Sequence, residues 1–286
     1  MPVVRGFLAE GGKVRILARA PESVAQRYSQ AEVVAGSMSD ATCVARVLAD
    51  ADAAFLMTPM GLRNDPSSEI AIAGQLIAGA KKAGLNHLIY TSVLTADDPS
   101  DVGILHAKYE IEAHIRAAEI PHTILRCGSY MEDVFDPRIR LLESGRFLFP
   151  IDPERRFSYT SQADIPKFVM RYLVGADRAL NRAIDFVGPD VHSVIEVEAL
   201  LSDAFGHSIK ATPRLPYFYV FRALLPFFNA RAHRFSSVIP LMQHFDRNGY
   251  SSRSGDMQSQ FPGFRMTTLS EHLRNLSANA ARHRNA

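Results

Sequence analysis

Lys108 is the residue whose position in the sequence most strongly suggests chemistry. The segment LHAKYEIEAHIRAA has the 3.6-residue period of an amphipathic helix, and Lys108 falls on its apolar stripe with Ile104, Ile111, Ile115 and Ala118. A lysine on an apolar face must either extend its ammonium group to solvent or meet a polar partner. The sequence leaves both readings open. The other charged residues of the helix are expected to face away from this stripe: Glu110, Glu112 and Arg116.

Small and polar residues end the two strand-like segments on either side of this helix. HLIYTS ends in Thr91 and Ser92, and IPHTILRCGSYMED passes from an apolar run into Cys127, Gly128 and Tyr130. Because ligands bind at the carboxyl ends of strands in an open parallel sheet, the stretch 86–133 predicts two edges of one binding site. The simpler readings are that Thr91 and Ser92 only terminate a strand, and that Cys127 is a small buried hydrophobic residue.

Strand-like and helical segments alternate through the first half of the chain. This order predicts right-handed βαβ units and therefore an α/β fold with a doubly wound, Rossmann-like parallel sheet. Ser67 and Ser68 are candidate N-caps of the longest helix, and Gly84 is its expected stop. The expected strands span 13–18, 31–35 and 52–57, and the expected helices span 2–10, 22–28, 40–48 and 67–83.

The pattern changes after Asp133. We expect a small C-terminal α+β region interleaved with the first domain, so the predicted division is 1–133 and 134–286. Two residue pairs, Ser193 with Glu196 and Thr268 with Glu271, have the spacing of helix capping boxes. The other expected segments are strands at 147–151 and 184–187, a helix at 163–174, broken helices rich in aromatic residues at 213–245, and a polar loop at 251–262.

Composition narrows the class of protein. The 286 residues carry a net charge of only +2, which gives no electrostatic footprint for nucleic acid or a membrane surface. Two cysteines are too few for a disulfide framework or a zinc cluster and are typical of a reducing compartment. The most apolar run, 217–228, is too short and too interrupted to span a bilayer. These features predict a cytoplasmic protein with no metal site.

The motifs taken together resemble the NmrA-like branch of the atypical short-chain dehydrogenases/reductases. The series VRILAR, GSMSD, AFLMTP, HLIYTS, the helix with Lys108 and IPHTILRCGSYMED follows the order of that family, as do QADIPKFVMRYL, FVGPDVHSVIEVEALLSDAFGHSI and FPGFRMTTLSEHL. Each motif is weak by itself, but their order and spacing are fairly specific. The resemblance implies a Rossmann domain with a small substrate region and NADP(H), or sometimes NAD(H), as the cofactor.

Several residues acquire expected roles from this resemblance. Arg19 would receive the 2′-phosphate, a role that suits a planar, always-charged guanidinium group at a strand end. Lys108 would hold the ribose or assist proton transfer, which makes it the candidate catalytic residue. The remaining expected cofactor-binding residues are Met57, Thr58 and Pro59 beside the ribose, Thr91 and Ser92 near the nicotinamide, and Cys127, Gly128 and Tyr130 on the loop passing it.

The sequence also departs from the family pattern. The family begins with a strand and a glycine-rich turn that supply N–H groups to the pyrophosphate, and neither is present before the first expected helix. We expect a misplaced start or a truncated gene, and weakened cofactor binding by the chain as written. The Tyr-x-x-x-Lys pair of typical short-chain dehydrogenases is absent too.

Three functions are compatible with these features. The first is an NAD(P)H-dependent oxidoreductase acting on a small carbonyl or quinone-type substrate. The second is a non-catalytic nucleotide sensor that binds a protein partner, and the third is a truncated form with impaired cofactor binding. A homodimer is also possible, and the aromatic residues between 217 and 228 could form its face, line a substrate pocket or pack a core.

Overall fold

The computed structural model describes residues 2–58, 65–136, 139–149, 151–174, 180–212, 235–252 and 257–284. The chain divides into two compact units. Unit 1 comprises 1–61, 65–126 and 162–184, and unit 2 comprises 62–64, 127–161 and 185–286. The predicted boundary near residue 133 stays a prediction.

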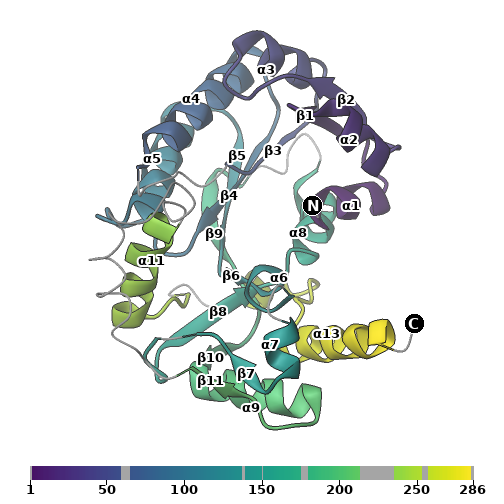
Figure 1. The fold of residues 1–286 in the computed structure, drawn as a ribbon. Coiled ribbons are helices and arrows are strands. Elements are labelled where there is room, and N and C mark those ends of the chain that lie inside the picture. Colours follow the sequence, from purple (N-terminus) through teal and green to yellow (C-terminus); the bar gives the residue numbers. More distant parts are fainter. Residues whose placement is uncertain are drawn as a thin grey trace. The chain divides into compact units, whose positions relative to one another are not determined.

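Unit 1 has the alternating order that the sequence predicts, so the α/β class is confirmed (Figure 1). Its strands are β1 (Arg15–Ala18), β2 (Glu32–Ala35), β3 (Ala54–Leu56), β4 (Leu88–Val93), β5 (His122–Cys127) and β9 (Arg182–Phe186), of which β5 and β9 end in unit 2. Its helices are α1 (Pro2–Ala9), α2 (Pro21–Arg27), α3 (Ala41–Leu48), α4 (Ser67–Lys82), α5 (Gly103–Ala117), α8 (Asp164–Phe168) and the π-helix η2 (Val169–Leu173).

Two ladders run through these strands. β1 pairs with β2 in parallel, and a second sheet has the order β3-β4-β5-β9, with β3 and β4 parallel. No ladder joins β1 to β3 among the residues that the structure describes. The resemblance would place the family's first strand between these two strands, and the expected absence of that strand stays a prediction.

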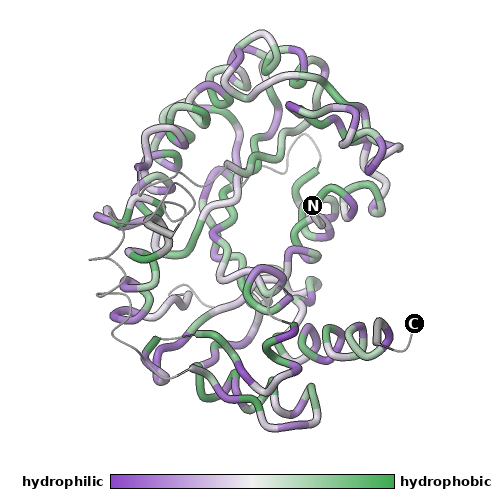
Figure 2. The backbone as a smooth tube through the Cα atoms, viewed as in Figure 1, coloured by the Kyte–Doolittle hydropathy of each residue, from purple (hydrophilic) through white to green (hydrophobic). Residues whose placement is uncertain are grey.

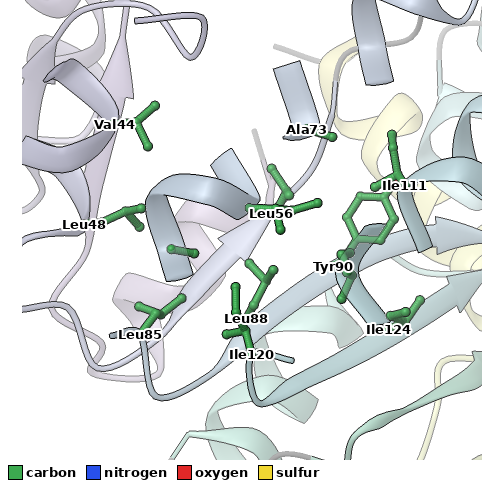
Figure 3. Packing of buried hydrophobic residues seen from close by; sticks show 13 residues of the cluster. Val44, Leu48, Leu56, Ala73, Leu85, Leu88, Tyr90, Ile111, Ile120 and Ile124 are labelled. Carbon is green, nitrogen blue, oxygen red and sulfur yellow. The ribbon is translucent and has the colours of Figure 1, made fainter. Parts of the chain in front are cut away.

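The core of unit 1 lies between this second sheet and helices α3, α4 and α5, which pack side by side. Leu56, Leu88 and Tyr90 point from the strands toward apolar residues of the helices (Figure 3). Burial of this apolar surface stabilises the fold by about 25 cal/mol per Å². The core therefore fixes the positions of strands β3 and β4, whose ends carry the candidate site.

Unit 2 combines short strands with helices around an aromatic core. β8 lies between β10, which is antiparallel to it, and β6, which is parallel, while β7 pairs with β11. Ring contacts run through Phe135, Phe147, Phe149, Phe157 and Phe245. The elements are β6 (Ser129–Tyr130), α6 (Met131–Val134), α7 (Ile139–Glu143), β7 (Arg146–Phe147), β8 (Arg156–Thr160), β10 (Val191–Ser193), α9 (Val194–Phe205), β11 (Lys210–Ala211), α11 (Phe235–Asn248), α12 (Met257–Gln260) and α13 (Leu269–Arg284).

Both predicted capping boxes are confirmed. The Ser193 side chain accepts from the Glu196 backbone N–H while Glu196 accepts from that of Ser193, and Thr268 and Glu271 make the same exchange. Each box satisfies two backbone donors that would otherwise be unpaired at a helix start. Helix α13 then alternates hydrophilic and hydrophobic residues (Figure 2), and it buries Leu269 and Leu273.

Several local predictions were wrong. Ser67 and Ser68 do not cap α4, because Pro66 already has helical dihedral angles and the Asp65 carboxylate accepts from the Ser67 N–H. The helix expected at 163–174 changes into a π-helix at Val169, and the strand expected at 147–151 ends at Phe147. Strand β8 was not predicted, and α12 lies inside the expected polar loop. Most of the aromatic-rich segment 213–245 lies outside the described residues.

Candidate functional site

A buried polar cluster surrounds Lys108 in unit 1. The Lys108 ammonium lies 2.7 Å from Glu69 Oε1 and donates to Thr58 Oγ1 at 2.8 Å, and the Thr58 hydroxyl donates to the same Glu69 oxygen at 2.6 Å. The Tyr90 ring lies beneath the ammonium, 5.4 Å from ring centre to Nζ. Four elements therefore meet in one hydrogen-bonded group: the end of β3, the first turn of α4, strand β4 and helix α5.

Lys108 is on the apolar seam of α5 as predicted. Ile104, Ile111 and Ile115 are buried, and Lys108 itself is 8% exposed. The sequence allowed two readings of Lys108, and the structure agrees with the second: the ammonium group meets a polar partner and does not extend to solvent. The partner is Glu69, which is 1% exposed.

The protonation state of this cluster follows from its charges. Burial by itself would lower the pKa of the Lys108 ammonium, but Tyr90 and Glu69 outweigh it and raise that pKa. Burial raises the pKa of the Tyr90 phenol, against the opposing effect of Lys108. At neutral pH the cluster therefore holds a protonated lysine and a neutral tyrosine. Lys108 can donate hydrogen bonds there, but it cannot act as a general base.

Thr91 and Ser92 lie at the carboxyl end of β4, and both are 3% exposed. The Thr91 hydroxyl donates to the Leu56 carbonyl at 3.3 Å, which fastens β4 to the end of β3. The Ser92 hydroxyl has no hydrogen-bond partner among the described residues. Buried hydroxyl groups are almost always paired, so this strand end has hydrogen-bonding capacity that the described residues do not use.

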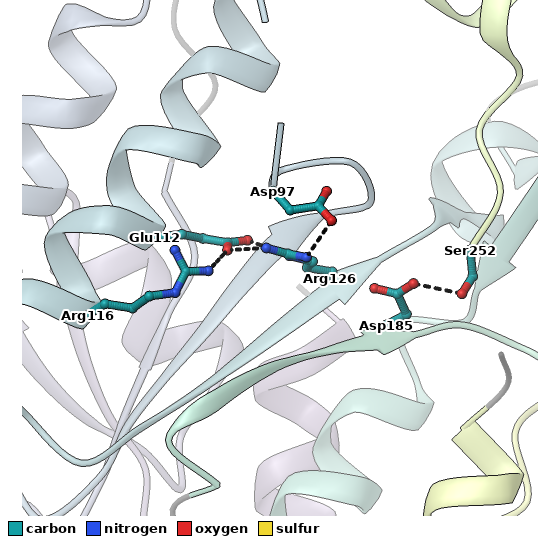
Figure 4. A network of polar contacts seen from close by, with 6 residues as sticks. All are labelled: Asp97, Glu112, Arg116, Arg126, Asp185 and Ser252. Carbon is teal, nitrogen blue, oxygen red and sulfur yellow. Dashed lines mark hydrogen bonds and ion pairs between the residues drawn. The ribbon is translucent and has the colours of Figure 1, made fainter. Parts of the chain in front are cut away.

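A second polar network joins α5, β5 and the loop after β4 (Figure 4). Glu112 accepts two hydrogen bonds from Arg126, at 2.9 and 2.7 Å, and another from Arg116. Arg126 also lies 3.4 Å from Asp97 of the loop. The prediction that Glu112 faces away from the core was wrong, because its side chain is fully buried and paired with Arg126, which a helical period alone cannot reveal.

Arg19 and Met57 lie at the ends of β1 and β3. Arg19 directly follows β1 and is exposed, and no partner is present for its guanidinium group among the described residues. Met57 follows β3 and is half-buried. Pro59 lies outside the described residues.

Unit 2 contains the other predicted loop. The Cys127 carbonyl accepts from the Tyr250 hydroxyl at 3.0 Å, and the Gly128 N–H donates to Thr160 Oγ1 at 2.9 Å. Only glycine fits at 128, because a Cβ there would lie 2.4 Å from the Ser158 carbonyl oxygen. Burial, with a further contribution from Cys127, raises the pKa of the Tyr130 phenol well above its ordinary value. Tyr130 is therefore protonated and can serve only as a hydrogen-bonding phenol at neutral pH.

The structure thus places Thr58 and Lys108 in direct contact and Thr91 beside them through the β3–β4 pairing. Sequence reasoning missed Glu69 and Tyr90. Glu69 could have been suspected, since a lysine on an apolar seam requires an anion, but no spacing rule connects positions 69 and 108. Among the described residues, no helix is both long and apolar enough to cross a membrane, and no group of three or more His, Cys, Asp or Glu side chains is arranged to hold a metal.

Comparisons with known proteins agree with this architecture. The chain is 30% identical to a (4-alkanoyl-5-oxo-2,5-dihydrofuran-3-yl)methyl phosphate reductase from Streptomyces griseus over 210 residues, 72% of this chain and 71% of that protein. The NADP(H) complex of Citrobacter sp. triphenylmethane reductase superposes with a TM-score of 0.77 at 18% identity, covering 96% of this chain and 95% of the other.

A second solved structure is a regulator. NmrA, described as a negative transcriptional regulator, superposes with a TM-score of 0.71 at 17% identity, covering 100% of this chain and 94% of the other. These two superpositions show the Rossmann-like fold that the sequence predicts. The model of the NmrA-like family matches residues 1–273, and the chain therefore belongs to the NmrA-like family.

Proposed function

We propose that this protein is an NAD(P)H-dependent oxidoreductase acting on a small carbonyl or quinone-type substrate. The observation that carries the proposal is the carboxyl end of β4, where the buried Ser92 hydroxyl has no partner among the described residues and Tyr90, two residues earlier, contacts the Lys108 ammonium. The strand ends of a parallel sheet are the usual nucleotide site. The Streptomyces relative is named as a reductase of an unsaturated oxo-furan ring, which supports a conjugated carbonyl substrate.

The residues present fit a dinucleotide in two respects. The exposed Arg19 guanidinium has no internal partner among the described residues and could hold a phosphate by paired hydrogen bonds. The Ser92 hydroxyl, which has no partner among the described residues, could accept a hydrogen bond from the nicotinamide amide group, which leaves its own proton available to donate. When bound, the cofactor would supply the hydride. Met57, Thr58 and Pro59 are proposed to contact the adenine-side ribose, and Thr91 and Lys108 the nicotinamide side. Cys127, Gly128 and Tyr130 stay proposed cofactor contacts that rest on the sequence alone.

The role of Lys108 is narrower than the resemblance implies. Its ammonium group already donates to Glu69 and Thr58, so we propose that it holds Thr58 in place and donates a hydrogen bond to the bound nucleotide. Proton transfer from Lys108 is disfavoured because its neighbours raise its pKa. The substrate proton would then come from solvent or from another hydroxyl group.

The alternative is a non-catalytic nucleotide sensor that acts through a protein partner. The sensor itself could be a monomer or a homodimer. The observation that favours it is the same buried ion pair, because a lysine fixed by a carboxylate cannot shuttle protons. The fold similarity to a negative transcriptional regulator agrees with this reading. We keep it as the second candidate function.

Nucleotide binding and turnover separate the two functions. We expect the protein to bind NADPH in calorimetry and to oxidise it when a naphthoquinone or an unsaturated ketone is added. Binding without acceptor-dependent oxidation would favour the sensor. Absence of any nucleotide binding would contradict both.

Arg19 gives a sharper test of the cofactor. We expect Arg19→Gln to weaken NADPH binding about ten- to a hundredfold, since a charge-assisted hydrogen bond contributes about 1.5–3 kcal/mol, and to leave NADH binding nearly unchanged. Arg182→Gln is the matched control, because Arg182 is an exposed arginine on β9. An equal loss of NADH and NADPH affinity would argue against a 2′-phosphate site.

A further inference from the structure

Two buried hydroxyl groups near the end of β4 lack hydrogen-bond partners among the described residues. They are Ser92 Oγ, at the penultimate position of the strand, and Thr95 Oγ1, in the loop that follows. Both atoms are shielded from solvent, and neither has a partner among the described residues. One unpaired buried hydroxyl costs stability, and two within four residues are unusual in a folded protein.

Thr95 carries a second cost in its backbone. Its φ is +67°, in the left-handed region that β-branched residues rarely adopt. Such a conformation persists only where the surrounding structure enforces it, and it is concentrated at functional sites.

The loop contains the contacts that enforce this conformation. Leu94 and Ala96 are each 1% exposed, so the residues on both sides of Thr95 are anchored in the core. The Thr95 carbonyl accepts from the Asp98 N–H at 3.2 Å, and Asp97 lies beside Arg126, which Glu112 holds by two hydrogen bonds. The strained threonine is therefore held in a defined position.

The charges on the elements around the loop determine what these hydroxyl groups can bind. Within the described part of the chain, Arg126 is the cation that contacts the loop, and it is neutralised by Glu112 and Asp97. Lys108, on the helix into which the loop leads, is neutralised by Glu69. Neither cation is available for a carboxylate or a phosphate, whereas two hydroxyl donors suit a neutral carbonyl oxygen.

We propose that Ser92 and Thr95 form a subsite for a neutral, oxygen-bearing electron acceptor, such as a ketone or quinone carbonyl, and that Thr95 determines the specificity for it. This inference rests on the proposed oxidoreductase function and specifies its substrate. It explains why a residue with both a strained backbone and an unpaired hydroxyl is held so firmly in this loop. A phosphate-bearing acceptor, as in the name of the Streptomyces relative, would fit this subsite less well.

Replacement of Thr95 by glycine separates binding from stability. Glycine adopts positive φ without strain, so we expect Thr95→Gly to raise Tm by about 2–4 °C. The same variant should raise KM for a neutral naphthoquinone about tenfold, the effect of losing one hydrogen bond. KM for NADPH should stay unchanged, and Thr95→Ser should retain most of the affinity for the quinone.

Glu119→Gly is the matched control. Glu119 is exposed and has φ +57°, so glycine relieves the same kind of strain away from the loop. We expect a similar rise in Tm with no change in KM for the quinone.

Each outcome has a distinct meaning. If the wild-type protein reduced quinones and Thr95→Gly kept its KM, the hydroxyl would face only ordered water and the inference would be overturned, while the proposed function stood. A preference of the wild type for a phosphate-bearing enone over its neutral analogue would overturn the assignment of a neutral acceptor. If the wild type reduced no acceptor at all, the proposed function would fail and the subsite with it.

Discussion

At the scale of single residues, the cluster of Lys108, Glu69 and Thr58 shows how one buried charge organises its surroundings. Moving an isolated ion from water to the protein interior costs several kcal/mol, and a well-placed counterion returns only part of that cost. The pair is therefore weak evidence for net stability. Removal of one partner alone, however, leaves the other charge buried without a counterion and is strongly destabilising.

This asymmetry gives a prediction for single and double variants. We expect Lys108→Met to lower the free energy of unfolding by about 3–5 kcal/mol, because Glu69 would be buried without a counterion. The double variant Glu69→Leu/Lys108→Met should recover most of that loss, since neither charge remains. Urea unfolding of the wild type, the single variants Lys108→Met and Glu69→Leu, and the double variant measures the coupling.

The comparison with a surface pair completes this test. Arg15 and Glu32 form an ion pair with side-chain exposures of 29% and 61%, and exposed pairs contribute about 0.2–1 kcal/mol. Glu32→Gln should therefore have little effect. A loss of similar size in Glu32→Gln and Lys108→Met would show that burial does not govern the energy of these pairs.

At the scale of elements, the packing of helix α4 on helix α3 depends on a glycine. A Cβ at Gly79 would lie 2.4 Å from Val44 Cγ1, and Val44 is fully buried. The valine side chain is stiff because it is branched at Cβ, so it cannot rotate away easily. The two helices can approach this closely only because residue 79 has no side chain.

Gly79→Ala tests this close approach. Alanine favours a helix over glycine by about 1 kcal/mol, but overpacking a filled core costs about 1–3 kcal/mol. The packing cost should exceed the helical gain, so we expect a net destabilisation of about 1 kcal/mol in thermal or urea unfolding. In the Val44→Ala background the clash with Val44 Cγ1 is absent, so there Gly79→Ala should no longer carry the packing cost. A single variant more stable than wild type would show that α3 can shift.

The sequence reveals elements and caps that follow from local periodicity. The seam of α5 and both capping boxes could be identified because their residues lie three or four positions apart. The start of α4 at Ser67 was predicted correctly, but its N-cap was not, because Pro66 occupies the cap position and the Asp65 carboxylate accepts from the Ser67 N–H. Strand β8 had a usable signal, since RFSYT is rich in β-forming residues.

At the scale of the whole chain, the contacts that matter most for the site are long-range. Glu69 and Lys108 are 39 positions apart, and Glu112 meets Arg126 across 14. No helical or strand period connects such pairs, so Lys108 could be identified as anomalous while its partner could not. The positive φ of Thr95, and the lack of a partner for its hydroxyl among the described residues, are likewise properties of the folded chain.

His87 makes long-range hydrogen bonds whose contribution to stability depends on pH. Its ring is 2% exposed and bridges the Leu173 carbonyl, 2.8 Å from Nδ1, and the Thr123 hydroxyl, 2.9 Å from Nε2. The carbonyl requires a proton on Nδ1, so Nε2 accepts from Thr123, whose oxygen in turn accepts from the Leu180 N–H at 3.1 Å. The neutral imidazole satisfies every one of these contacts.

Protonation of His87 should therefore destabilise the folded chain. Burial lowers its pKa, with a further contribution from His122 and against the effect of the Leu173 carbonyl. Because the pKa of the unfolded histidine is about 6.5, the contribution of His87 to stability is complete above that pH and is lost as the pH falls toward the lower folded-state pKa.

We expect wild type to exceed His87→Gln in free energy of unfolding by the largest margin near pH 7.5. That margin should narrow below about pH 6.5, measured by urea unfolding across the series, with the exposed His114→Gln as the control. A margin that widens on acidification would mean that the folded state holds the imidazolium ion, and the assignment of the proton to Nδ1 alone would be wrong.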